Sequence, residues 1–306
     1  MSKSFRLAVG VLFIIAASVF LTPPFYSMLP MFKFEKIFNR LLMIFAVAVV
    51  VLLIFLEKRK QGQINKTNFF RETGFDFSVP WLKLFWVGFL IGALAVGFII
   101  VSEVLFGPSH FRHPILLQDV IERFVKGMLT GVIVGVVEEF FFRGFIFNNL
   151  KKSIYVGLAV ILSSAVYSMS HFFDNGQTFI PQHPSTADSF RLLFGYFEPF
   201  IANWSKIFPE FIGLFIFGIV LCIVFLRTKS LFMSIGIHAG AVFAIKFQHS
   251  FVRKGPIDAI DHFFGRAPEY DGPFEWAVLI ILAFILWFWI LPYLELKVLS
   301  RPVENS

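Results

Sequence analysis

The chain has 306 residues, of which 57% are hydrophobic and only 15% are charged. The mean hydropathy of +0.77 is typical of an integral membrane protein and argues against an ordinary soluble domain. The net charge of +7 indicates little about nucleic acid, because Lys and Arg in membrane proteins flank the spans and set their orientation. Since no basic block is interleaved with aromatic residues, we expect no nucleic-acid partner.

Eight apolar stretches approach or reach the length of about 20 residues that crosses the hydrocarbon core of a bilayer. The sixth and seventh are separated only by Arg227-Thr228-Lys229-Ser230, which predicts a tight helical hairpin. The distribution of Lys and Arg favours both termini on the inner side. The predicted spans are Leu7–Leu21, Leu41–Leu56, Leu84–Phe106, Val125–Phe147, Ile154–Phe173, Phe211–Leu226, Leu231–Phe247 and Trp276–Leu291.

The amino terminus resembles a signal peptide, with Lys3 and Arg6 before an apolar run, but Thr22-Pro23-Pro24 offers no small-residue cleavage site. We therefore expect an uncleaved first span. The single cysteine, Cys222, excludes an intrachain disulfide and argues against a thiolate metal site. No internal repeat or soluble-domain boundary is visible, so residues 1–306 are predicted to form a single membrane domain. Two long loops, 174–208 and 250–275, could carry short interfacial helices.

The fourth predicted span carries Glu138, Glu139 and Arg143 among Val and Phe residues. An ionised group near the bilayer centre costs about 2.5–3.5 kcal/mol on insertion scales, so such groups usually have a function. Glu139 and Arg143 are four residues apart, one helical turn, which predicts a buried ion pair. Glu138 is rotated by about 100° from that pair, and we interpret it as the group available for chemistry.

Gly127, Gly131 and Gly135 extend the stripe of Glu139 backwards along the same span. Such a small-xxx-small pattern lets two helix backbones approach closely. We therefore expect another helix to pack against this glycine face.

Two histidines lie in or at the edge of apolar spans, His171 at the end of the fifth and His238 within the seventh. A lone buried histidine usually only packs, but here two accompany a pair of intramembrane glutamates. Carboxyl and imidazole groups together can transfer protons near neutral pH. Gly236 and Gly240 flank His238 and would let a backbone or a substrate come close.

The pattern Glu138-Glu139-x-x-x-Arg143, then Tyr167-x-x-x-His171, then His238, resembles the three motifs of the CPBP family of intramembrane proteases. This family includes the prenyl-protein (CAAX) endopeptidases and bacterial relatives tied to bacteriocin immunity. A bare EExxxR is a weak signal, but three motifs in the right order on membrane helices are specific. The likeness covers Val125 to Phe247, so residues 125–247 are the expected core region.

The resemblance implies an all-α fold, a polytopic membrane helix bundle with about eight transmembrane helices around a polar cavity. It implies an endopeptidase of the cell membrane that hydrolyses a CAAX-type or other hydrophobic peptide or membrane-protein substrate. Glu138 and His171 would activate the attacking water, while His238 would support the tetrahedral oxyanion. Glu139 and Arg143 would hold the shape of the site, with Tyr167 as a further supporting residue.

Two features do not follow simply from this resemblance. The family usually has Asn four residues after the third-motif histidine, and here that position is Val242. Loss of one oxyanion donor typically costs about 10²–10³ in turnover, unless His238 or a backbone N–H replaces it. In addition, His171 is predicted nearer the outer side than Glu138, so a tilt, a broken fifth helix or a shifted span boundary would be needed.

Three alternative functions remain open. The chain could be a catalytically inactive immunity or scaffold protein of the same family, as Val242 suggests. It could be a proton-coupled or ion-coupled transporter, although the inverted repeats typical of transporters are not visible. A zinc-dependent peptidase is the third alternative, but the HExxH pattern is absent. We therefore expect no metal or other cofactor, and the oligomeric state is open.

Overall fold

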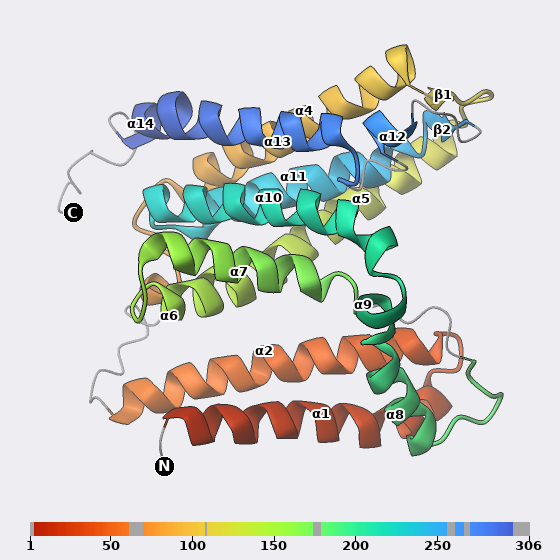
Figure 1. The fold of residues 1–306 in the computed structure, drawn as a ribbon, viewed down its shortest axis with the longest axis vertical. Helices are drawn as coiled ribbons and strands as arrows, with labels where there is room; N and C mark the ends of the chain where they lie inside the picture. Colours follow the sequence, from red (N-terminus) through yellow and green to blue (C-terminus); the bar gives the residue numbers. More distant parts are fainter. Residues whose placement is uncertain are drawn as a thin grey trace. The chain divides into compact units, whose positions relative to one another are not determined.

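The computed structural model describes residues 3–60, 70–107, 109–173, 179–255, 261–265 and 270–295. The chain divides into two compact units, Met1–Phe69 with Ser170–Ile207 and Phe70–Met169 with Phe208–Ser306. Figure 1 shows the helices of both units, and the predicted all-α polytopic bundle is confirmed. Whether residues 1–306 act as one membrane domain stays a prediction.

Among its described residues the first unit has two long helices and two short ones, together with the first residues of a further helix, α10 (Trp204–Thr228). A core of Val19, Phe34, Phe38, Leu192 and Tyr196 joins the long helices to the first short helix. The short helices lie in the first of the two long predicted loops, one of the possibilities left open for it. These helices are α1 (Lys3–Met28), α2 (Phe34–Lys60), α8 (Thr186–Gly195) and α9 (Glu198–Ala202).

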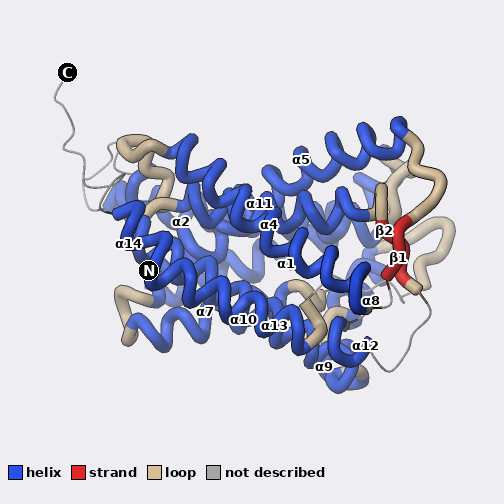
Figure 2. Tube along the Cα trace, turned by 90° about the horizontal axis from the view of Figure 1, so that it is seen from above, coloured by secondary structure: helices blue, strands red, loops and turns tan. Residues whose placement is uncertain are grey.

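The second unit holds the remaining helices and one small sheet, a feature that the sequence did not predict. Figure 2 shows its two short strands, β1 and β2, in red; they pair antiparallel, with His110 opposite Arg253. The elements are α4 (Trp81–Phe106), β1 (Ser109–Phe111), α5 (Leu117–Glu139), η1 (Phe140–Phe147), α6 (Asn148–Leu150), α7 (Val156–Ser170), α10 (Trp204–Thr228), α11 (Leu231–Gln248), β2 (Val252–Lys254), α12 (Asp261–Phe264), α13 (Pro273–Ile285), η2 (Leu286–Ile290) and α14 (Leu291–Leu294).

Six helices in the described parts of the chain are long and apolar enough to cross a membrane, so the count of eight spans is not confirmed. The fifth predicted span, Ile154–Phe173, corresponds to α7, which ends at Ser170 and has only 15 residues. The fourth, Val125–Phe147, corresponds to the end of α5 and the π-helix η1. It is absent from the six because α5 carries charged residues along its length, among them Glu122, Lys126 and Glu138. The six are Val9–Met28, Phe34–Leu56, Trp81–Phe106, Trp204–Thr228, Leu231–Gln248 and Pro273–Leu294.

Helices α1 and α10 are longer than the apolar runs indicated, because proline does not end them. Helix α1 continues through Pro23 and Pro24, and α10 begins before Pro209. The predicted hairpin between α10 and α11 is confirmed. There Lys229 has a positive φ of 53°, and the Ser230 hydroxyl accepts a hydrogen bond from the Phe232 N–H, a typical N-cap.

Helix α11 is the centre of the second unit, with 67% of its residues buried. It packs between α4 and α5, and in Figure 1 it runs alongside both. A Cβ added at Gly131 of α5 would lie 2.5 Å from the Ala239 carbonyl oxygen. One added at Gly240 of α11 would lie 2.0 Å from the carbonyl oxygen of Phe89 in α4. The predicted glycine face therefore does receive a second helix, and only glycine permits this backbone contact on both sides.

We predict that Gly92→Ala destabilises the protein by about 1–3 kcal/mol, because overpacking a close contact forces the helices apart. A Cβ at Gly92 would lie 2.0 Å from the Ile237 carbonyl oxygen, whereas one at Gly97, on the same helix, has nothing within 4 Å. Gly97→Ala is the matched control and should be neutral or slightly stabilising. Thermal unfolding of both variants in detergent measures the difference, and equal midpoints would contradict the packing argument.

Candidate active site

The polar site begins where α5 changes its helical geometry. Glu138 and Glu139 are the last two residues of α5, and the backbone continues directly into the π-helix η1, which contains Arg143. A π-helix closes its hydrogen bonds between residues five apart, and such segments are often found at functional sites. The sequence pattern indicated only a continuous helix at this point.

The predicted ion pair between Glu139 and Arg143 is confirmed. Arg143 Nη1 donates to Glu139 Oε1 at 2.8 Å, and both side chains are 0% exposed. Arg143 Nη2 also donates to the carbonyl oxygen of Gly218 in α10 at 3.2 Å. The guanidinium carbon lies 4.4 Å from the ring centroid of Tyr167 in α7, a favourable cation–π distance. Arg143 thus joins three helical segments around one buried charge.

His238 of α11 lies between the two glutamates. Its Nδ1 is 3.0 Å from Glu139 Oε1, the oxygen that also accepts from Arg143. Because an ionised carboxylate only accepts hydrogen bonds, this contact assigns the Nδ1 proton to His238. The other ring nitrogen, Nε2, then faces Glu138, whose Oε2 lies 3.8 Å away.

The two glutamates and His238 differ in how much of each side chain is exposed. The side chain of Glu138 is 25% exposed, whereas those of His238 and Glu139 are 4% and 0% exposed. Glu138 is therefore the more accessible side chain of the pair, although its Oε2, which faces His238, is buried. This agrees with the helical-face prediction that Glu138 points away from the Glu139–Arg143 pair.

Aromatic rings surround the histidine on the sides that the carboxylates leave open. The rings of Phe217 and Tyr167 lie edge-on to the imidazole, with centroids at 5.7 and 6.2 Å. Phe217 also stacks on Tyr270 at 5.5 Å. The motif pattern indicated Tyr167, but not Phe217 or the Gly218 carbonyl group, because an apolar ring and a backbone oxygen are not part of any of the three motifs.

The family motifs also direct attention to His171 and to Val242. His171 is the first residue after α7 and belongs to the first compact unit, so its part in the site stays a prediction. The helix boundary is nevertheless corrected, since the fifth span was expected to continue to Phe173. Val242 is half-buried on α11, one helical turn beyond His238.

Two glutamates and two histidines in one chain could in principle bind zinc. Within the described ranges, no group of three or more His, Cys, Asp or Glu side chains is placed to hold a metal ion. Glu139 Oε1 is already shared by Arg143 and His238. The expectation that the protein works without a metal stays a prediction.

An acid–base cluster enclosed by apolar helices defines this chain as a membrane protein with a polar site inside its helix bundle. Residues 120–244, which include both glutamates and His238, match the model of a protein family described as type II CAAX prenyl endopeptidase Rce1-like. This match supports membership of the CPBP family, as the motifs predicted. Neither a curated protein nor a solved structure matches the chain.

We predict that Arg143→Met costs about 3–5 kcal/mol of stability, because it leaves a buried carboxylate without its cation. The double variant Glu139→Gln/Arg143→Met should recover much of this loss, since it removes both charges. The matched control is Lys126→Met, which breaks the exposed Glu122–Lys126 pair on the same helix with the same i,i+4 spacing. That change should cost less than about 1 kcal/mol. Thermal unfolding in detergent compares them, and a double variant as unstable as the single one would contradict the pairing argument.

Proposed function

We propose that the protein is a glutamate-dependent intramembrane endopeptidase that cleaves a CAAX-type or other hydrophobic peptide at the cell membrane. The observation that carries the proposal is the juxtaposition of Glu138, which is accessible, with His238, which Glu139 holds in position. Both residues lie in the stretch that matches the Rce1-like family. That family is one of proteases, so hydrolysis is supported at the family level.

In the proposed reaction Glu138 acts as general base. Its carboxylate takes a proton from a water molecule while the water oxygen attacks the carbonyl carbon of the substrate. The tetrahedral oxyanion then forms beside Glu138, on the side that His238 Nε2 faces. Because the Nδ1 proton is donated to Glu139, Nε2 donates to the oxyanion only when the ring carries a second proton, as an imidazolium. Collapse of this intermediate breaks the carbon–nitrogen bond, and the proton held by Glu138 passes to the leaving amine. Donors that are fixed before the reaction are most effective in a water-poor site.

The remaining residues have positioning parts in this proposal. Glu139 and Arg143 hold the imidazole, and Tyr167 covers the guanidinium group. His171 is proposed to assist Glu138 in activating the water, as the family resemblance implies. The partners are a peptide or membrane-protein substrate and the lipid bilayer, and we propose neither a nucleic-acid partner nor a cofactor.

We predict that Glu138→Gln lowers turnover by at least about 10²-fold, the usual contribution of a general base. Purified protein in detergent is offered prenylated or hydrophobic peptides, and cleavage products are quantified. Glu122→Gln is the matched control, because Glu122 is an exposed carboxylate on the same helix. Cleavage that survives in Glu138→Gln at the wild-type rate would refute the assigned base.

Because the cluster holds its charges through Arg143 and His238, we expect cleavage to persist after dialysis against a chelator such as EDTA. The same peptide assay is repeated with and without added Zn²⁺. Loss of activity that zinc restores would contradict the metal-free mechanism and favour the zinc-dependent alternative.

A further inference from the structure

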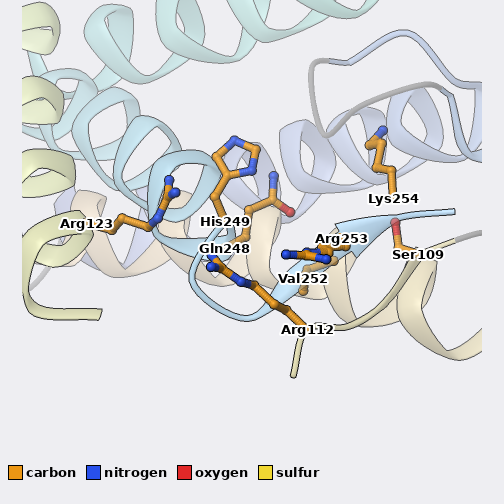
Figure 3. A pocket seen from close by; sticks show the side chains of 8 residues that line it. All are labelled: Ser109, Arg112, Arg123, Gln248, His249, Val252, Arg253 and Lys254. Carbon is orange, nitrogen blue, oxygen red and sulfur yellow. The ribbon is translucent and has the colours of Figure 1, made fainter. Parts of the chain in front are cut away.

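A second polar site lies at the end of α11, away from the acid–base cluster. There a cavity of about 480 Å³ opens beside the paired strands β1 and β2. Figure 3 shows the side chains that line it, among them Arg112, Arg123, Arg253 and Lys254. His238 and His249 are eleven residues apart in the sequence, so at 1.5 Å per helical residue the two sites are roughly 16 Å apart along α11.

The cavity is lined by more Arg and Lys side chains than there are carboxylates paired with them. Arg112 pairs with Asp119 at 3.1 Å, and Lys254 Nζ lies 3.9 Å from Glu103. Within the described part of the chain, no ion pair joins Arg123 or Arg253 to a carboxylate. Neither guanidinium group has a described carboxylate within ion-pair distance, and Glu122, the acidic neighbour of Arg123, is paired with Lys126. Like charges around one cavity repel unless an anion enters.

Paired backbone segments bring these cations to one cavity. The antiparallel pairing sets Ser109 opposite Lys254 and His110 opposite Arg253. The N–H of Arg112 donates to the Phe251 carbonyl oxygen at 2.7 Å, which extends the pairing beyond the strands. Arg123 comes from the second turn of α5. The site is therefore built by three separate segments, and the planar fork of Arg suits the oxygens of a phosphate group.

The surface beside the cavity is apolar and exposed. It consists of residues around the start of α5, among them Leu116, Leu117, Ile121 and Phe124, whose exposed fractions lie between 47% and 73%. The membrane-length helices α4 and α11 end at Phe106 and Gln248, and each leads into one of the two paired strands beside the cavity. A soluble anion would satisfy only the charged cavity, whereas a lipid offers a charged headgroup and an apolar remainder together.

We propose that this cavity binds the phosphate of an anionic lipid headgroup at the membrane interface. The apolar part of the lipid then lies against the exposed residues at the start of α5. Arg123 and Arg253 supply the charge that the phosphate neutralises, and Arg112 and Gln248 complete the lining. The site is independent of the proposed peptidase reaction.

The test measures lipid binding by the full chain in detergent. The probe is phosphatidylglycerol with a fluorescent acyl chain, compared with the same labelled form of phosphatidylcholine. Wild-type protein should bind phosphatidylglycerol saturably, and Arg123→Gln/Arg253→Gln should weaken binding by at least about tenfold, because two charge-assisted contacts are removed. Lys126→Gln/Lys246→Gln is the matched control, since it removes two exposed charges from the same helices, α5 and α11, outside the cavity.

The binding measurements either support the lipid site or overturn it. Binding that falls only in the cavity variant, with an unchanged unfolding midpoint, supports it. Equal binding of the two lipids, or equal loss in both double variants, would show only a diffuse surface charge and would overturn it. Inorganic phosphate is added as a competitor in a separate series. If millimolar phosphate displaces the lipid probe from the cavity, or binds where the lipid does not, the occupant is a soluble phosphate and the lipid assignment is overturned.

Discussion

The carboxylate of Glu139 is the contact on which the arrangement of the site depends. One of its oxygens accepts hydrogen bonds from Arg143 in η1 and from His238 in α11. All three side chains are almost completely buried, so water cannot replace a lost partner. In such surroundings the desolvation of a charge is compensated only by close and complete pairing. The Glu139–Arg143 pair therefore determines the orientation of the His238 imidazole ring, and so the nitrogen, Nε2, that faces Glu138.

This pairing is possible because α11 lies close to both of its neighbours. Glycines on α4, α5 and α11 remove the side chains that would otherwise separate the backbones. Between membrane helices there is little hydrophobic driving force, so close packing and hydrogen bonds supply much of the association. The glycine contacts and the buried ion pair thus act on the same helices and support each other.

The two polar regions of the second unit differ in how their charges are compensated. In the interior, Arg143 and His238 are matched to Glu139, and the accessible carboxylate of Glu138 lies beside them. At the end of α11, Arg123 and Arg253 are not matched by any described carboxylate. The first arrangement suits proton transfer to a neutral substrate, and the second suits an anion that comes from outside the protein.

Much of the architecture was predictable because it rests on local spacing in the sequence. The apolar runs indicated a membrane helix bundle, the interval from Glu139 to Arg143 indicated an ion pair, and the glycine stripe indicated a helix contact. Each of these follows from the period of a single helix. The helix ends were less predictable, because Pro23 and Pro209 did not act as terminators and α7 stopped before His171.

Only the tertiary structure decided which residues from different helices meet. His238 contacts Glu139 across 99 positions of the chain, and Gly218 contributes a backbone oxygen that no sequence pattern marks. The basic cavity was invisible for the same reason, since Arg112, Arg123 and Arg253 come from a loop, a helix and a strand. Helical periodicity states which face a side chain occupies, but rotation and packing of the helices decide what that face touches.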